Sequence, residues 1–314
     1  MRAAVDTLPG KLGEIAAYHL GWVGAEGGGG KLLRPALVLA AAGAGPADEL
    51  VAGAAAVELA HNFTLLHDDV IDRDRTRRHR PTAWTVFGAE NAILAGDAML
   101  ALALRLVRGE AARRLAECVI EICEGQHEDC AFERRDDVTL EECLAMAEKK
   151  TAALLGCACA LGALAVGADA QTVTALDAFG REVGMAFQLT DDLLGIWGDP
   201  AVTGKPVGAD LAARKKSLPV VAALSEGAAS ERSAGAEAAA ELAGLYALER
   251  ALTELELRRA ADAVERAGGR DWAAAEAAAR VSRAYAHVAK APGVSQAAIR
   301  DLCAIADLIT RRTF

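Results

Sequence analysis

Alanine restricts the fold of this chain more than any other residue, because it occupies 74 of the 314 positions. Alanine is the strongest helix former and is depleted in β-strands. Aromatic residues make up only 4% of the chain, and few runs of β-branched residues occur. Apolar positions follow helical spacing almost throughout. The sequence therefore predicts an all-α protein, and its 53% hydrophobic residues argue against a disordered one.

The helical pattern continues along the whole chain, so we expect a single domain spanning residues 1–314. No biased linker divides the chain, and no repeat with a period of roughly 20–50 residues occurs. A long helix is predicted over residues 171–197, before a glycine and a proline. Residues 204–218 are expected to form a polar loop. The Ala/Glu/Ser-rich residues 225–242 are expected to form an exposed connection or a short surface helix.

The charge balance limits the partners of the chain. Its 34 Lys and Arg against 44 Asp and Glu leave a net charge of −10, which disfavours binding to nucleic acid. The first 20 residues carry charges throughout and lack the apolar core of a signal peptide. The seven cysteines form no CxxC pair, as expected for reduced thiols in a cytoplasmic protein.

Residues 151–168 form an uncharged run that is marginal for a transmembrane helix, which takes roughly 20 apolar residues. The run consists mainly of Ala, Gly and Cys, with four leucines. Small side chains allow neighbouring helices to approach closely. We therefore expect the central helix of a soluble bundle and no transmembrane segment.

The strongest chemical signal is a cluster of aspartates, Asp68, Asp69 and Asp72. On a helix, Asp68 and Asp72 lie one above the other on the same face, where two like charges destabilise the helix. A divalent cation would compensate this repulsion. Because the cluster offers carboxylate oxygens and has no nearby thiol, it suits Mg²⁺.

A second cluster, Asp191 and Asp192, interrupts an otherwise apolar helical segment one turn after Gln188. Adjacent carboxylates among apolar neighbours are costly unless a positive group meets them. A single aspartate cluster is compatible with a solvated helix face. Two clusters on two separate apolar helices favour a chemical role.

Positive residues recur near both clusters, and they are the partners that a diphosphate requires. Arg forms paired contacts to phosphate oxygens, Lys supplies a point charge, and Mg²⁺ bridges carboxylates to phosphates. The glycines before Lys31 do not complete a Walker A motif, no GxGxxG follows a predicted strand, and no GxSxG occurs. The basic residues concerned are Lys31, Arg34, Arg73, Arg75, Arg77, Arg78, Arg80, Lys149, Lys150, Lys205, Lys215 and Lys216.

In these motifs the chain resembles the trans-isoprenyl diphosphate synthases, or polyprenyl synthetases. The similarity extends from Gly30 to about Pro219, and five motifs occur in the order found in that family. The resemblance implies a single-domain bundle of long helices around a central prenyl-diphosphate cavity, and a homodimer. The motifs are Gly30-Lys31-x-x-Arg34-Pro35; His61 through Asp72; Arg77-Arg78 followed by Arg80-Pro81-Thr82; Lys150-Thr151; and Gln188 through Asp192 with Gly204-Lys205 and Lys215.

The resemblance also implies a role for each motif residue. Isopentenyl diphosphate would be bound by Lys31, Arg34, His61 and Arg78. The allylic diphosphate would be bound by Arg77, Lys150, Thr151, Gln188, Lys205 and Lys215. Three Mg²⁺ ions, which Mn²⁺ can replace, would be held by Asp68, Asp69, Asp72, Asp191 and Asp192. The catalytic set would be Asp68, Asp72, Arg77, Lys150, Asp191 and Lys205.

By the same resemblance, the chain would be a prenyltransferase that joins isopentenyl diphosphate to an allylic diphosphate head to tail. Mg²⁺ clamped between Asp68, Asp72 and Asp191 would stabilise the departing diphosphate together with the basic residues. The double bond of isopentenyl diphosphate would then attack the allylic cation in a 1′-4 condensation. Loss of a proton would complete a short-chain all-trans prenyl diphosphate.

Two residues below the first aspartate cluster bear on product length. Phe63 lies five residues before Asp68, or about 7.5 Å along a helix, and Thr64 is small. No extra residue is inserted between Asp69 and Asp72. This pattern resembles family members that make the C20 product, geranylgeranyl diphosphate. Farnesyl (C15) and C25 products stay open, as does ordinary core packing of Phe63.

Near the second cluster the chain departs from the family pattern at Gly195, at Arg214 and at Ser217, which replaces a common threonine. Gly195 stands where many members have the last aspartate of the second motif. We therefore expect one outer carboxylate, which in the family acts through water, to be missing. Arg214 replaces a common glycine before Lys215.

Two other functions use related features. A class I terpene cyclase ionises a prenyl diphosphate with similar aspartates, but it needs no second diphosphate site of the kind that Lys31, Arg34, His61 and Arg78 would supply. A non-catalytic regulatory subunit of a prenyl synthase commonly loses an aspartate-rich motif, whereas the first motif is intact here. The sequence favours the synthase over both.

Overall fold

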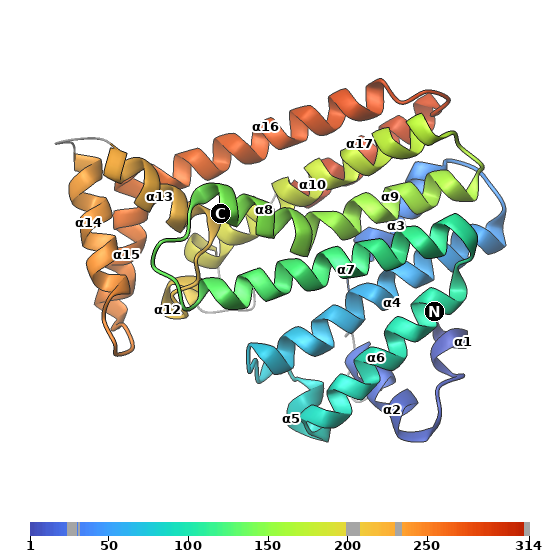
Figure 1. The fold of residues 1–314 in the computed structure, drawn as a ribbon, viewed down its shortest axis with the longest axis horizontal. Coiled ribbons are helices and arrows are strands. Elements are labelled where there is room, and N and C mark those ends of the chain that lie inside the picture. Colours follow the sequence, from blue (N-terminus) through green and yellow to red (C-terminus); the bar gives the residue numbers. More distant parts are fainter. Residues whose placement is uncertain (24–29, 31, 199–207, 230–233, 311–314) are drawn as a thin grey trace. The chain divides into compact units, whose positions relative to one another are not determined.

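The structure of the chain, a computed structural model, describes residues 1–23, 30, 32–198, 208–229 and 234–310. Helices make up most of this part of the chain (Figure 1). The only strands in the described ranges are the short β1 (Thr76–Arg77) and β2 (Arg80–Pro81). The predicted all-α fold is therefore confirmed.

The residues group into two compact units, which are described separately. The first unit consists of Met1–Ile120, Leu154–Gly180 and Val288–Ile305. The second unit consists of Glu121–Ala153, Arg181–His287 and Ala306–Phe314. The division falls inside two long helices, α7 (Gly109–Phe132) and α10 (Ala170–Trp197), and inside α17 (Gln296–Thr310).

The first unit is organised around α4 (Ala47–Ile71), a helix of 25 residues. Helix α4 packs against α3 (Leu33–Ala42), α5 (Ala83–Phe87) and α6 (Ala89–Leu106), and Figure 1 shows α4 and α6 side by side. The short helices α1 (Arg2–Val5) and α2 (Gly10–His19) contact α6. This packing places the C-terminal end of α4 next to the strands that follow it.

Helix α9 (Ala153–Ala165) contains most of the uncharged run, and its side chains are buried except at its C-terminal end. A Cβ at Gly162 would overlap the carbonyl of Val38 on α3, and a Cβ at Gly180 on α10 would overlap the carbonyl of Leu155. Small residues therefore let these helices touch, as predicted. Within the described ranges, no helix is long and apolar enough to cross a membrane.

Two buried clusters form the core of the second unit. The first joins α8 (Leu140–Ala147), α10 and α16 (Gly269–Ala289) through residues such as Cys143, Leu189 and Ala273. The second joins α13 (Leu218–Ala229), α14 (Ala234–Tyr246) and α15 (Glu254–Arg266) through residues such as Val220 and Leu242. The unit also contains the π-helix η1 (Glu148–Ala152) and the short helix α12 (Ala209–Ala212).

The helix predicted over residues 171–197 is confirmed by α10, whereas two later segments differ from their prediction. The expected loop over residues 204–218 contains helix α12, whose Leu211 is buried. Residues 225–242 enter helix α14, in agreement with the helical alternative, but Ala238, Ala239 and Leu242 are buried and not on the surface. Alanine has a small and weakly hydrophobic side chain, so a buried face made of alanines leaves little hydrophobic pattern.

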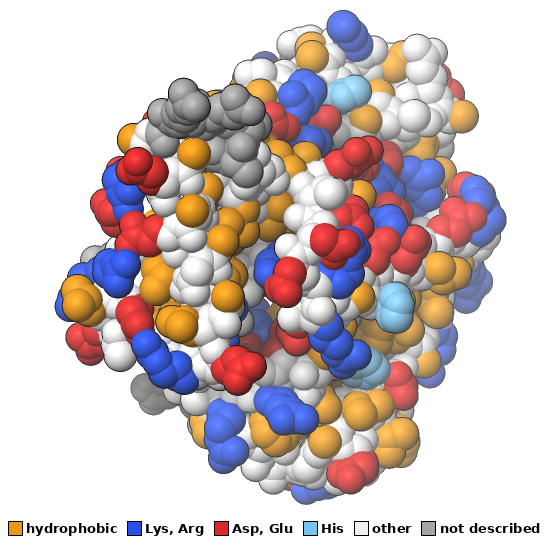
Figure 2. All heavy atoms as spheres, turned by 60° about the vertical axis from the view of Figure 1, so that its left-hand side comes forward, with side chains coloured by type: hydrophobic (Ala, Val, Ile, Leu, Met, Phe, Trp, Pro, Cys, Tyr) orange, Lys and Arg blue, Asp and Glu red, His pale blue; other side chains and the backbone are white. Residues whose placement is uncertain are grey.

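Acidic and basic side chains are interspersed over the face drawn in Figure 2, with apolar side chains between them. Among the described side chains on this face, Figure 2 shows no continuous basic tract. The mixture agrees with the small excess of acidic residues in the sequence, which gives the net charge of −10.

Candidate active site

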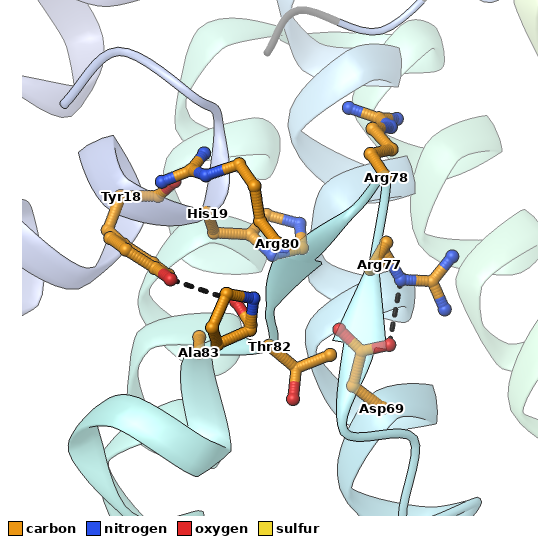
Figure 3. A pocket seen from close by; sticks show the side chains of 9 residues that line it. Tyr18, His19, Asp69, Arg77, Arg78, Arg80, Thr82 and Ala83 are labelled. Atoms are coloured by element: carbon orange, nitrogen blue, oxygen red, sulfur yellow. Dashed lines mark hydrogen bonds and ion pairs between the residues drawn. The ribbon is translucent and has the colours of Figure 1, made fainter. Parts of the chain in front are cut away.

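The first aspartate cluster lies at the C-terminal end of α4. Asp68 is half-buried and Asp72, which caps the helix, is exposed. Asp69 is only 1% exposed, and its Oδ1 accepts a hydrogen bond of 2.7 Å from Nε of Arg77 (Figure 3). Burial raises the pKa of Asp69, and the charge of Arg77 opposes that rise. Two carboxylates are therefore accessible, whereas the third holds an arginine.

Arg77 and Arg78 belong to a β-hairpin that directly follows α4. Strands β1 and β2 pair antiparallel with Arg77 opposite Arg80, so Arg78 and His79 alone form the turn. Their φ angles are 52° and 60°, in the left-handed region that favours glycine. A two-residue hairpin turn of this kind requires positive φ at both central residues. Arg78, whose guanidinium is presented by this turn, therefore carries backbone strain.

Contacts to α2 and to the end of α4 fix the hairpin. The hydroxyl of Tyr18 donates to the carbonyl of Pro81 at 2.9 Å, and Nη1 of Arg80 donates to the carbonyl of Tyr18 at 3.1 Å. The Arg80 guanidinium also stacks 4.4 Å from the centre of the Tyr18 ring. Oγ1 of Thr82 donates to the carbonyl of Asp74 at 2.8 Å. These contacts set the position of the arginines before any ligand binds.

Three of the four residues predicted to bind isopentenyl diphosphate influence one another electrostatically. Burial holds the pKa of His61 well below its usual value, and the charges of Arg34 and Arg78 lower it further. His61 is therefore neutral near pH 7. The Arg78 guanidinium packs against Gly30, where a Cβ would lie 3.0 Å from Nη2. The fourth residue, Lys31, lies outside the described residues.

A buried polar row beside the hairpin was not predicted. Glu58 and Asn62 on α4 are 5% and 1% exposed, and Nδ2 of Asn62 donates to Oε1 of Glu58 at 3.2 Å. Asn62 also hydrogen-bonds His19 on α2, whose pKa falls to about 3 because of burial and the two hairpin arginines. The sequence contains one indication of this row, because the spacing of Glu58, Asn62 and Asp69 places all three on the same face of a helix.

The hairpin, α2 and the end of α4 together line a small pocket, drawn in Figure 3. Arg77 reaches toward Asp69 there, while Arg78 extends from the turn in another direction. The wall is mainly cationic, which suits an anion with several oxygens. It is lined by Tyr18, His19, Asp69, Arg77, Arg78, Arg80, Pro81, Thr82 and Ala83.

A pocket in the second unit collects residues from motifs that are distant in the sequence. Oγ1 of Thr151 donates to Oε1 of Gln188 at 2.7 Å, and Nε2 of Gln188 donates to Oδ1 of Asp192 at 2.8 Å. The backbone N–H of Leu218 donates to the other oxygen of Asp192 at 2.9 Å. The pocket is lined by Asp129, Met146, Ala147, Lys150, Thr151, Gln188, Asp192, Lys215, Lys216, Ser217 and Leu218.

The two aspartates of the second cluster occupy different environments. Asp192 is 3% exposed, and burial raises its pKa to about 6 although Lys215 lowers it. Burial alone would lower the pKa of Lys215, but the carboxylates of Asp192, Asp210 and Asp129 outweigh it and raise that pKa. Lys215 thus keeps its charge although its side chain is half-buried. Asp191, by contrast, is exposed on α10.

Lys150 lies in the π-helix η1, a rare form that is frequent at functional sites. Its Nζ donates to Oδ2 of Asp129 on α7 at 2.5 Å, whereas Lys149 donates to Glu124 and Glu128 at 2.7 and 2.6 Å. Of these two lysines, Lys150 lines the pocket. Asp129 was not predicted, because nothing in its local sequence distinguishes it from the other acidic residues of α7.

Two of the departures from the family pattern, Gly195 and Arg214, can be described locally. A Cβ at Gly195 would overlap Oδ2 of Asp210 and lie 2.6 Å from its Cγ, so the Asp210 carboxylate fills the space of a side chain at position 195. Arg214 has a φ of 51°, where glycine is favoured, and its guanidinium donates to the carbonyl of Arg250. The nearby Lys205 lies outside the described residues.

The two predicted chain-length residues point in different directions. Phe63 is 6% exposed and packs edge-on against His67, with ring centres 4.8 Å apart. Thr64 is half-buried. At about 100° per residue, Thr64 lies one turn from Asp68 on nearly the same face, whereas Phe63 is rotated about 140° from it. Thr64 is therefore better placed to act below the accessible aspartates.

The accessible carboxylates fit Mg²⁺ that is shared with a substrate. Among the described residues, no three His, Cys, Asp or Glu side chains converge to form a metal cage. Mg²⁺ usually binds through one or two carboxylates, with water and substrate phosphates as the remaining ligands. Asp68 and Asp72 provide oxygen donors alone, one turn apart, as that binding mode requires.

Several known proteins are similar to this chain over most of its length. The profile of the polyprenyl synthetase family matches residues 25–244. The geranylgeranyl diphosphate synthase of Mycobacterium tuberculosis is 47% identical, over 99% of this chain and 90% of that protein. A (2E,6E)-farnesyl diphosphate synthase of Mycobacterium bovis is 45% identical, over 96% and 87%. The crystal structure of a polyprenyl synthetase from Streptomyces coelicolor has a TM-score of 0.90 at 43% identity, over 98% and 94%.

Proposed function

Because the chain belongs to the polyprenyl synthetase family and is a prenyltransferase, we propose that its product is geranylgeranyl diphosphate. It would condense isopentenyl diphosphate with an allylic diphosphate through 1′-4 bonds until the tail reaches C20. Enzymes of this family depend on Mg²⁺, which fits the oxygen-only donors of the first aspartate cluster.

One observation carries the proposed binding of the allylic diphosphate: each described cation predicted to bind it has a carboxylate counter-ion in its own unit. A counter-ion orients a long side chain before the substrate arrives, so less conformational entropy is lost on binding. Several oriented cations suit a diphosphate, which carries several charged oxygens. The pairs are Asp69–Arg77, Asp129–Lys150 and Asp192–Lys215.

We propose that the isopentenyl diphosphate is bound by Arg34, His61 and Arg78, together with Lys31. A neutral His61 donates a hydrogen bond to a phosphate oxygen without titrating near pH 7. The strained hairpin turn keeps Arg78 separate from Arg77, so that the neighbouring arginines serve two different diphosphates.

The metal-binding role is proposed for Asp68, Asp72 and Asp191, with three Mg²⁺ ions that Mn²⁺ can replace. When bound, the ions supply positive charge to the diphosphate leaving group. Asp69 and Asp192 are proposed to act through their basic partners instead, since both are buried and accept hydrogen bonds from the protein.

Ionisation of the allylic substrate would then be assisted by Arg77, Lys150 and Lys215, with Lys205, which share the charge of the departing diphosphate. The second N–H of the Gln188 amide would orient it, and Thr151 would hold that amide in place through its own hydrogen bond to Gln188. The double bond of isopentenyl diphosphate would attack the allylic cation, and the proton would leave to the released diphosphate. We propose that the protein acts as a homodimer, which light scattering would test.

The C20 length is proposed from the small Thr64 on the Asp68 face. Relatives of similar identity carry the names of a C20 and a C15 enzyme, so overall similarity does not choose between them. A small side chain at position 64 leaves room below the aspartates for a longer tail than an aromatic one would.

The experiment is to incubate the purified protein with Mg²⁺, isopentenyl diphosphate and either dimethylallyl, geranyl or farnesyl diphosphate, and to identify the products by mass. We expect the C20 diphosphate from all three primers. If no primer leads to consumption of isopentenyl diphosphate, the prenyltransferase mechanism is wrong. A cyclic hydrocarbon from a single prenyl diphosphate would indicate a terpene cyclase. C15 or C25 products would overturn the chain length alone.

A further inference from the structure

The second-unit pocket contains a third lysine, Lys216, to which none of the motifs gives a role. It follows Lys215 directly, and its side chain is 15% exposed. Lys216 lines the same pocket as Lys150, Thr151 and Gln188. A lysine side chain of such low exposure has lost part of its hydration, which is costly unless its charge is paired. The charge of Lys216 therefore needs a partner.

Lys216 differs from the other pocket lysines in its counter-ion. Lys150 donates to Asp129 at 2.5 Å, and buried carboxylate charge compensates Lys215. The ion-pair partner of Lys216 is Asp136, whose Oδ1 is 3.8 Å from Nζ and whose side chain is fully exposed. A long ion pair with an exposed carboxylate contributes little, because water screens it. The charge of Lys216 is therefore weakly compensated by the described part of the protein.

The remaining contacts of Lys216 are a hydrogen bond to its backbone and a weak attraction between its ammonium group and an aromatic ring. The thiol of Cys143 donates to its carbonyl at 3.5 Å. Nζ lies 5.7 Å from the centre of the Tyr246 ring, an attraction that leaves the N–H donors available. A phosphate oxygen would thus replace a weak partner and would not have to break a short ion pair.

We propose that Lys216 binds the diphosphate of the allylic substrate as the third lysine of the second-unit pocket, exchanging Asp136 for a phosphate oxygen. This inference rests on the proposed prenyltransferase function. A charge-assisted hydrogen bond between a mostly buried ammonium and a phosphate is stronger than the exposed pair it replaces. Lys216 then adds affinity for the substrate whose diphosphate lies nearest Lys150.

The test is Lys216→Met, which keeps the length of the side chain and removes its charge. The dissociation constant of farnesyl diphosphate is measured calorimetrically with Mg²⁺ and without isopentenyl diphosphate, so that no turnover occurs. We expect binding to weaken roughly 10-fold or more. The KM for farnesyl diphosphate should rise in parallel, while the KM for isopentenyl diphosphate stays within about twofold. Lys216→Arg, which restores the charge, should recover most of the affinity.

Lys149→Met is the matched control, because Lys149 pairs with Glu124 and Glu128 and does not line the pocket. Unchanged farnesyl diphosphate affinity in Lys216→Met overturns the proposal, as does an equal loss in Lys149→Met. A loss of farnesyl diphosphate affinity that comes from misfolding is identified by the circular dichroism spectrum of Lys216→Met and by comparison with Lys216→Gln, which also lacks the charge. A wild-type protein that binds no farnesyl diphosphate and consumes no isopentenyl diphosphate overturns the prenyltransferase function as well. An active wild type with an unaffected Lys216→Met overturns this inference alone.

Discussion

Oδ1 of Asp69 accepts a hydrogen bond of 2.7 Å from Nε of Arg77, eight residues further along the chain. The Asp69 side chain is 2% exposed and that of Arg77 is 31% exposed. The pair joins the end of α4, where Asp68 and Asp72 are accessible, to the hairpin that carries the arginines. The orientation of Arg77 is therefore coupled to the helix that would hold the metal.

Asp69→Asn removes the charge of that pair and keeps its shape. We expect kcat/KM for the allylic substrate to fall roughly 100-fold, because small displacements of a charge-stabilising group have effects of this size. Steady-state kinetics with varied farnesyl diphosphate measure the change. Asp97→Asn on α6, which removes an exposed carboxylate, is the control and should change little. Wild-type kinetics in Asp69→Asn would show that Arg77 is oriented by something else.

Asp192 should make stability fall as the pH rises. Its pKa is about 6 in the folded protein against an ordinary 3.8, so the unfolded chain releases this proton first. Between about pH 4 and 6 the folded state therefore binds the additional proton, and the free energy of unfolding decreases with rising pH. The contribution is at most about 3 kcal/mol over this window.

Urea denaturation at about pH 4, 5 and 6 measures the contribution of Asp192, and Asp192→Asn should remove it from the pH dependence. The exposed Asp262→Asn serves as the control, since Asp262 pairs only at the surface. Identical pH slopes for the wild type and Asp192→Asn would contradict a raised pKa at this position.

His79→Gly should stabilise the hairpin, because His79 has a φ of 60°. Relief of this strain is worth about 1 kcal/mol, partly offset by the greater freedom of glycine in the unfolded chain. A small rise in Tm by calorimetry is the expected result. Asp136→Gly, also in an exposed turn but without positive φ, should lower Tm instead. Equal effects of both substitutions would rule out the strain at residue 79.

Thr64→Phe should shorten the product from C20 toward C15, because its ring would fill the space one turn below Asp68 on nearly the same face. Mass analysis of the products from dimethylallyl diphosphate measures the shift. Phe63→Ala should instead cost about 3–5 kcal/mol of stability, as removal of a buried aromatic ring does, and leave C20 as the product. Longer products from Phe63→Ala would place Phe63, and not Thr64, beneath the tail.

The features that could be predicted from the sequence depend on residues that lie close together along the chain. Helix α10, the small-residue contacts of α9 and the two aspartate clusters all follow from spacing within one segment. The counter-ions do not, since Asp129 meets Lys150 across 21 residues and His19 reaches α4 from a separate helix. Tertiary packing determines which residues form such pairs, and a local sequence pattern does not predict them.

Two adjacent aspartates can also lie in different environments, and the residue type alone does not predict which of them is buried. Asp68 and Asp69 are adjacent, yet successive residues on a helix point about 100° apart. One is therefore half-buried at the accessible end of α4, and the other is buried against the hairpin. The same rotation of about 100° between successive residues leaves Asp191 exposed and Asp192 buried on α10.

The most direct test is the Mg²⁺-dependent rate of elongation of farnesyl diphosphate with isopentenyl diphosphate, measured for the wild type and for Asp68→Ala. We predict that the wild type yields the C20 diphosphate. Asp68→Ala should be slower by roughly 1,000-fold or more, with an unchanged circular dichroism spectrum, because one of the accessible carboxylates proposed to bind Mg²⁺ is lost. A variant that elongates farnesyl diphosphate at the wild-type rate would contradict the metal site at the end of α4.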